Sequence, residues 1–208
     1  MVTKRPPTAS QTRRSRKREL TEDHLAATAL KLFDAHGFEA VTMEQIAAAA
    51  DVAKGTLYNH FPVKEALLAY LFRQEIATGM QQLHGALQSQ KTFAARMRFL
   101  LRESARWNES RRAYMPHYLR FRTLDVGAPA GSDRQQRHSS GSQGILEALF
   151  RAGQDSGEVR KDLSPSKLAS LFEFMCFGAV VVWLGEPDGD LNERFQFGLD
   201  VLLNGAAS

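Results

Sequence analysis

The stretch of sequence that decides the fold is residues 42–62, TMEQIAAAADVAKGTLYNHFP. Thr42 and Gln45 have the spacing of a capping box, which marks the start of a helix. Asp51 stands where the chain must turn. Asp suits this position because it tolerates the left-handed conformation better than most residues. Pro62 stops the second helix or opens the next one. The pattern therefore predicts two short helices joined by a tight turn, as in a helix-turn-helix motif.

The second of these helices, expected over residues 53–60, has two different faces. Leu57 and Phe61 lie four residues apart and, with Ala53, form the expected inward stripe. Gly55 lowers helix stability by roughly 1 kcal/mol relative to alanine, and we interpret it as allowing DNA to approach the backbone closely. The outward surface combines one full positive charge with hydrogen-bonding groups: Lys54, Gly55, Thr56, Tyr58, Asn59 and His60.

These outward side chains suit double-stranded DNA. Lys54 can contact phosphate or guanine, Thr56 can reach a base or a methyl group, and Asn59 can pair with adenine. Tyr58 and His60 can donate hydrogen bonds to phosphate oxygens. In the major groove this helix would read the sequence, while the preceding helix would brace it against the DNA backbone. Lys64, at the start of the next helix, is expected to add positive charge beside a helix N-terminus that is suited to binding phosphate.

The N-terminal end of the chain is strongly basic. Residues 1–18 hold seven Lys and Arg residues and no acid, whereas residues 19–73 hold four basic and eight acidic residues. We expect residues 1–18 to be a disordered arm that supplies nonspecific affinity, lying in the minor groove. The first helix is expected to begin after Thr21 as its N-cap and to end at Gly37.

The rest of the chain reads as helix, with no alternation typical of strands. A connection is expected at residues 125–133, where Gly and Pro gather. We predict an all-α protein of about nine helices, with a helix-turn-helix domain at residues 19–73 and a helical domain at residues 74–208, joined by a fourth helix. The helices after the motif are expected near residues 63–88, 93–108, 114–124, 133–154, 164–185 and 191–203.

Residues 41–68, VTMEQIAAAADVAKGTLYNHFPVKEALL, strongly resemble the DNA-binding segment of the TetR-type (tetracycline-repressor) family. The resemblance covers roughly residues 20–72 and is most specific in the G-T-L-Y-x-H-F-x-x-K core. It implies a dimeric helical transcription factor, usually a repressor, that binds a near-palindromic operator and is released when its C-terminal domain binds a small effector. It also implies backbone contacts by Thr42, Tyr58, His60 and Lys64, and base-facing positions for Lys54, Gly55, Thr56 and Asn59.

The sequence departs from the family pattern at three positions. Asp51 stands where the family often has Gly, Ala53 where it often has a capping Ser, and Val63 replaces another common capping residue. Each lost cap is worth about 1 kcal/mol where nothing compensates. These departures affect the fine geometry of the motif.

The helices after the motif are expected to bind the effector and form the dimer. The resemblance implies that the last two helices of the chain pair with their copies, and we assign to this interface Leu168, Leu171, Phe172, Met175, Ala179, Val182 and Trp183. The alternative is that some of them are ordinary core. Aromatic side chains favour an apolar or aromatic effector, and the candidate pocket residues are Met97, Leu101, Trp107, Tyr114, His117, Tyr118, Phe121, Phe174 and Phe177.

Other chemistries find little support in the sequence. The single cysteine, Cys176, cannot form an internal disulfide, which favours a cytoplasmic location, and the six histidines lack zinc spacing. No cofactor, metal, membrane or catalytic role is expected. Two rival hypotheses remain: a helical small-molecule carrier or enzyme without specific DNA binding, which would need a catalytic pair in the pocket, and an architectural DNA-binding protein without an effector.

Overall fold

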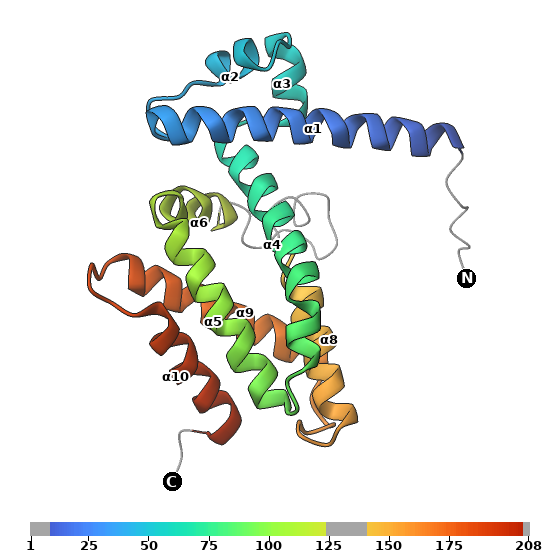
Figure 1. Cartoon of the computed structure of the whole chain (residues 1–208), viewed down its shortest axis with the longest axis vertical. Helices are drawn as coiled ribbons and strands as arrows, with labels where there is room; N and C mark the ends of the chain where they lie inside the picture. The colour runs from blue at the N-terminus through green and yellow to red at the C-terminus, as the bar shows by residue number, and fades with distance from the viewer. Residues whose placement is uncertain (1–8, 124–140, 206–208) are drawn as a thin grey trace. The chain divides into compact units, whose positions relative to one another are not determined.

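A computed structural model describes residues 9–123 and 141–205, and Figure 1 shows the order of their helices. Within these ranges there is no strand, so the predicted all-α class is confirmed. The chain divides into two compact units, Met1–Leu71 (unit 1) and Phe72–Ser208 (unit 2), with the boundary inside helix α4. Unit 1 contains α1 (Ala9–His36), α2 (Met43–Ala49), α3 (Lys54–His60) and the first turns of α4 (Lys64–Gln88).

The first helix begins earlier than the sequence predicted. α1 starts at Ala9, so residues 9–18 are helical and not the expected disordered arm; residues 1–8 lie outside the described residues. Five of its ten residues are Arg or Lys, which favour helix as Ala9 and Gln11 do, and no Gly or Pro interrupts it. Thr21 is not an N-cap, because its hydroxyl donates to the carbonyl oxygen of Lys17 at 3.0 Å, inside the helix.

The helix-turn-helix geometry follows the capping signals. The Thr42 side chain accepts a hydrogen bond from the Gln45 amide, and the Gln45 side chain accepts one from the Thr42 amide, so the predicted capping box is present. Asp51 has φ 53°, the left-handed conformation that the turn requires. Gly37 ends α1 with φ 82°, and its amide donates to the Phe33 carbonyl at 2.8 Å.

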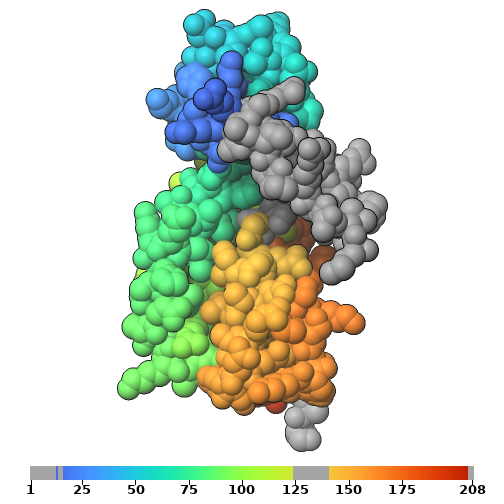
Figure 2. Space-filling model, turned by 90° about the vertical axis from the view of Figure 1, so that its right-hand side faces the viewer, coloured from blue at the N-terminus to red at the C-terminus, as the bar shows by residue number. Residues whose placement is uncertain are grey.

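Unit 2 holds the remaining helices, which pack around one core. α8 packs against α9 and α5, α10 packs against α5 and α9, and α6 packs against α9. In Figure 2 the second half of α4 and α8 lie side by side on the same face. The helices that follow α4 are α5 (Phe93–Ser110), a 3₁₀ turn η1 (Arg112–Tyr114), α6 (Met115–Thr123), α8 (Gln143–Asp155), α9 (Pro165–Leu184) and α10 (Leu191–Asn204).

Most predicted boundaries in unit 2 agree with the structure, but one differs. The helix expected over residues 133–154 begins at Gln143 in the described residues, because Gly141 has φ 81° and stops a helix from extending through it. The expected connection at residues 125–133 lies outside the described residues. The start of α9 follows the prediction, since the Ser164 side chain caps it and Pro165 occupies its first turn.

Helix α9 is unusually apolar. By length and composition alone it could cross a membrane, and 28% of the residues in its most apolar window are buried. Within unit 2, however, it is a packing helix that contacts α6, α8 and α10. Its contact with α10 is so close that a Cβ atom added at Gly198 would lie 2.6 Å from the Met175 sulfur. One side of α9 therefore belongs to the core of unit 2.

Candidate DNA-binding surface and effector cavity

The α3 helix separates apolar from polar side chains much as its sequence predicted. Leu57 is fully buried and Phe61 nearly so, which fixes the inner face of α3 in unit 1. Ala53, in contrast, is exposed as the N-cap residue and makes no side-chain capping bond, so it does not belong to the inward stripe. The exposed residues are Lys54, Gly55, Tyr58 and Asn59, while Thr56 and His60 are half-buried.

A carboxylate from α2 lies beside this surface. Glu44 accepts a hydrogen bond from the Tyr58 hydroxyl at 3.3 Å, and its carboxylate lies 3.8 Å from the Lys54 ammonium. Local desolvation and the Glu44 charge raise the pKa of Tyr58, so the phenol is a neutral donor at physiological pH. Glu44 was not singled out in the sequence analysis. Its contacts across the motif involve residues 10 and more positions away, which a local pattern does not reveal.

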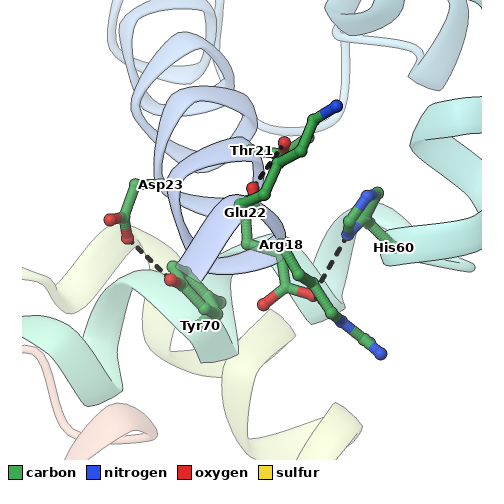
Figure 3. Close-up of polar contacts among 7 residues, drawn as sticks. Arg18, Thr21, Glu22, Asp23, His60 and Tyr70 are labelled. Atoms are coloured by element: carbon green, nitrogen blue, oxygen red, sulfur yellow. Dashed lines mark hydrogen bonds and ion pairs between the residues drawn. The ribbon is translucent and has the colours of Figure 1, made fainter. Parts of the chain in front are cut away.

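Polar contacts tie α1 to α3 and α4, as Figure 3 shows. Glu22 accepts from the Arg18 guanidinium at 2.7 Å and lies 3.1 Å from the Nδ1 atom of His60. On the next residue of α1, the Asp23 carboxylate accepts from the Tyr70 hydroxyl at 2.6 Å. One ring nitrogen of His60 is therefore engaged within unit 1, leaving Nε2 for its predicted phosphate contact.

Lys64 is held by the loop that joins α1 to α2. Its ammonium donates to the carbonyl oxygens of Phe38 at 2.7 Å, Glu39 at 3.2 Å and Val41 at 3.2 Å. It also lies 4.5 Å from the centre of the Phe38 ring, a cation–π contact. Three carbonyls use all three donors of an ammonium group. The structure thus gives Lys64 a role in closing this loop that the sequence did not reveal, and its predicted phosphate contact remains untested.

Unit 2 contains a partly open cavity of about 220 Å³ whose lining is mainly apolar. Side chains from α4, α5, α6, α8, α9 and α10 contribute to the lining. The α4 contribution was missed by the sequence analysis, although a glycine within that helix, Gly79, was a signal, since it leaves open space where a side chain would stand. The lining residues that we had not predicted include Ile76, Gly79, Met80, Leu83, Leu100, Asn108, Met115, Leu119, Arg122, Ile145, Leu146, Phe172, Glu173, Cys176 and Val180.

The predicted pocket residues divide into two groups. Four of them line this cavity: Leu101, Trp107, Tyr118 and Phe177. The other five lie elsewhere in unit 2 and do not line it, because α5, α6 and α9 turn them away. Met97 and Phe121 are buried in the core, and Phe174 is 72% exposed. Tyr114 and His117 are half-buried.

Carboxylates at the cavity are held by arginines. Glu75 accepts two hydrogen bonds from the Arg111 guanidinium, at 2.8 and 3.1 Å, and one from the Trp107 indole at 2.9 Å. Glu173 accepts from the Arg122 guanidinium at 3.1 Å and from the Ser142 hydroxyl at 2.9 Å. Each carboxylate therefore has a cationic partner within hydrogen-bonding distance, which offsets the cost of partial burial.

Two other groups at the cavity carry protons at neutral pH. Burial raises the pKa of the Cys176 thiol to about 12, and the nearby Glu173 charge acts in the same direction. Burial also raises the pKa of the Tyr118 hydroxyl, against the opposing charge of Arg122. Cys176 is therefore a neutral apolar wall residue, far from the thiolate state of a reactive cysteine.

The side of α9 that faces away from the core of unit 2 exposes large apolar side chains, and so does the neighbouring α10. We call this set the outer apolar face, and its members are Leu171, Phe174, Val181, Val182, Phe197 and Val201, with Phe174 and Phe197 at least 70% exposed. Of the predicted dimer residues, Leu171 and Val182 lie on this face. Leu168, Phe172 and Trp183 are instead buried within unit 2, and Met175 and Ala179 are half-buried.

A family model for bacterial regulatory proteins of the tetR family matches residues 25–71, the span that contains α2, α3 and the turn between them. This span is a DNA-binding domain of the TetR family. The resemblance of residues 41–68 to the TetR family is thereby confirmed, and so is the predicted function of the protein as a DNA-binding transcriptional regulator. TcmR of Streptomyces glaucescens, an HTH-type transcriptional regulator, is 48% identical over 52 residues, which are 25% of this chain and 23% of TcmR.

Similarity to other regulators extends over almost the whole chain. MftR of Mycobacterium tuberculosis, named as a transcriptional regulator of mycofactocin biosynthesis, is 26% identical over 92% of this chain and 94% of its own length. Thermus thermophilus FadR, a TetR-family repressor solved with lauroyl-CoA, has a TM-score of 0.80 at 22% identity, covering 90% of this chain and 95% of FadR. RolR, solved with resorcinol, has a TM-score of 0.69 at 18% identity, covering 91% of this chain and 90% of RolR. At these identities the solved structures show the shared fold.

Proposed function

We propose that this regulator is a homodimeric repressor that binds a near-palindromic operator and is released by a small apolar or aromatic effector. DNA reading is assigned to residues 19–73, and effector binding and dimerisation to residues 74–208. The proposal includes no catalytic step, and it places the protein in the cytoplasm with the DNA that it controls.

One observation carries the DNA-binding part of the proposal. On α3, the buried Leu57 fixes one face, while Lys54, Gly55 and Asn59 stand exposed on the other. A cation, a bare backbone and an amide are the groups that a recognition helix uses in the major groove. A helix that served only packing would not need a glycine at position 55. Gly55 weakens the helix, and a Cβ atom added there would meet no atom within 4 Å.

The effector part of the proposal is supported by the cavity in unit 2. Its mainly apolar lining includes the aromatic rings of Trp107, Tyr118 and Phe177. The similar structures of FadR and RolR were solved with an acyl thioester, lauroyl-CoA, and an aromatic diol, resorcinol. The lauroyl chain and the resorcinol ring are apolar groups, which agrees with the apolar or aromatic effector that we propose.

The dimer part of the proposal is supported by the outer apolar face. Phe174 on α9 and Phe197 on α10 are 72% and 70% exposed, and four aliphatic neighbours extend the patch along both helices. Contiguous apolar surface of this kind marks interaction sites in soluble proteins. A second copy of the same helices would bury it, and two recognition helices about 34–36 Å apart would then face successive major grooves.

The test is binding of the full chain to the DNA that flanks its own gene, followed by fluorescence anisotropy. We expect sequence-specific binding with a stoichiometry of two chains per site, and release when an effector is added. Specific binding that no candidate ligand affects would favour the architectural rival. Binding with no preference for the flanking DNA over a scrambled duplex would contradict the operator and favour the carrier or enzyme.

A further inference from the structure

One polar atom at the cavity differs from all those around it. The Tyr118 side chain on α6 is 4% exposed, and its ring packs edge-on against Phe72 with 4.9 Å between ring centres. Among the described residues no group makes a hydrogen bond of good geometry with its hydroxyl, although the Arg122 guanidinium lies near it and opposes the rise of its pKa. Buried hydroxyl groups in folded proteins nearly always have a partner, and leaving one without any is costly. A buried unpartnered hydroxyl at a cavity wall is where a ligand atom would be expected.

The direction of the missing hydrogen bond follows from the neighbours of Tyr118. Two cations, Arg122 and Arg73, act on Tyr118, and the guanidinium carbon of Arg122 lies 5.8 Å from the centre of the Tyr118 ring. A guanidinium group has only donors, so it could approach the phenolic oxygen without using the phenolic proton. The proton of Tyr118 is therefore available, and the ligand atom that meets it must be an acceptor.

The charges at the cavity limit the ligand further. Glu75 is held bidentately by Arg111, and Glu173 is held by Arg122 and by the Ser142 hydroxyl. A third carboxylate, on Glu103, lies 2.8 Å from the Arg106 guanidinium. A ligand with a net charge would have to break one of these pairs or remain uncompensated in an apolar cavity, and both are expensive. An uncharged ligand has neither cost.

The size of the cavity sets a third limit. A volume of about 220 Å³ holds roughly seven water-sized groups, if each takes about 30 Å³. We infer that this cavity binds an uncharged, mostly apolar molecule of about that size, with one hydrogen-bond acceptor that receives the Tyr118 hydroxyl proton. The inference rests on the proposed function only in regarding this cavity as the effector site.

Three probes of equal size test the inference by calorimetry on the full chain. Acetophenone carries a carbonyl acceptor, α-methylstyrene replaces that oxygen with a CH₂ group, and benzoate replaces the methyl ketone with an anion. We expect acetophenone to bind at least tenfold more tightly than either of the others. In Tyr118→Phe, acetophenone should lose about tenfold in affinity while α-methylstyrene is unchanged, because only the ketone uses the phenolic proton. Tyr114→Phe, on a tyrosine that does not line the cavity, should retain the wild-type preference.

Several outcomes would overturn the inference. Tighter binding of benzoate than of acetophenone would exclude an uncharged ligand. Equal binding of acetophenone and α-methylstyrene, or a preference that survives in Tyr118→Phe, would remove Tyr118 as the donor. Absence of binding by both neutral probes would contradict the cavity assignment itself. DNA binding is measured separately, so a protein that shows the tyrosine-dependent preference but no specific DNA binding would refute the proposed function and leave this inference standing.

Discussion

On the α3 face of unit 1, Asn59 is exposed and makes no hydrogen bond within the described residues, whereas at the cavity of unit 2 the carboxylates of Glu75 and Glu173 are held by arginines. Both regions are meant for partners, but the partners differ. A DNA duplex brings many acceptors and donors to an open surface, so polar groups there can be hydrated by water until the DNA binds. A small ligand in a mainly apolar cavity can satisfy only a few groups, and among the lining residues the Tyr118 hydroxyl is buried without a partner.

This comparison has a practical meaning for mutagenesis. The Asn59 side chain on the α3 face should affect DNA binding and leave stability almost unchanged, because it makes no hydrogen bond within the described residues. Side chains that close a loop or fill a cavity wall should affect stability first. Four substitutions separate these two classes.

Lys64→Met should have the largest effect, on stability. It removes the cation that three carbonyls of the loop before α2 share, and we expect the free energy of unfolding to fall by about 2–3 kcal/mol. Urea denaturation followed by circular dichroism measures it, with Lys31→Met on the exposed side of α1 as the control. Unchanged stability together with weaker binding to every DNA sequence would instead make Lys64 a phosphate contact, as the sequence suggested.

Asn59→Ala should affect binding alone. We expect the operator affinity to fall by about 2 kcal/mol, roughly 30-fold, with relaxed preference at one base pair and an unchanged melting temperature. Competition binding against operator variants measures the preference. Tyr58→Phe is the matched control, because a lost phosphate contact weakens all sequences evenly. An equal loss of affinity on all sequences in Asn59→Ala would show that this amide does not read a base.

Gly55→Ala should move stability and binding in opposite directions. Nothing in the chain lies within 4 Å of the added Cβ atom, so the substitution should stabilise α3 by up to about 1 kcal/mol. The same methyl group would stand between the α3 backbone and the DNA, so operator affinity should fall. Thermal unfolding and anisotropy on one preparation measure both changes. Unchanged or tighter DNA binding would contradict the close approach that we assign to Gly55.

Tyr118→Phe should have the smallest effect on the ligand-free protein, and it tests the cavity half of the comparison. Removing a buried hydroxyl without a partner should leave the free energy of unfolding unchanged or raise it by about 1 kcal/mol. Urea denaturation without ligand measures this change. A loss of stability above 1 kcal/mol would mean that the hydroxyl is bonded within the chain.

Local patterns predicted the motif well. The capping box at Thr42, the left-handed turn at Asp51 and the buried position of Leu57 each depend on residues at most a few positions apart. The early start of α1 was missed because a basic, polar segment has the composition of both an exposed helix and a disordered arm, and only the favourable propensity of Arg and Lys pointed to helix.

The cavity and the partners of the charged residues were predicted less well, for a physical reason. The lining consists of the space that several helices leave between them, so it depends on how they pack and on which side of α9 faces inward. The periodicity of α9 is weak, since apolar residues surround it, and Phe174 was therefore assigned to the pocket although it is 72% exposed. The carbonyls that bind Lys64 belong to a loop more than 20 residues away.

The placement of Lys64 has a consequence for how fast this regulator finds its site. With that ammonium directed at three carbonyls, Lys54 is the full positive charge that α3 itself offers to the duplex, and it lies beside the Glu44 carboxylate. Electrostatic steering and sliding along DNA then depend on the basic residues near the start of the chain, among them Arg13, Arg16 and Lys17. The rate at which the protein associates with DNA and the lifetime of the complex thus depend on different segments. Ionic strength should change the rate of association, and substitutions on α3 should change the lifetime of the complex.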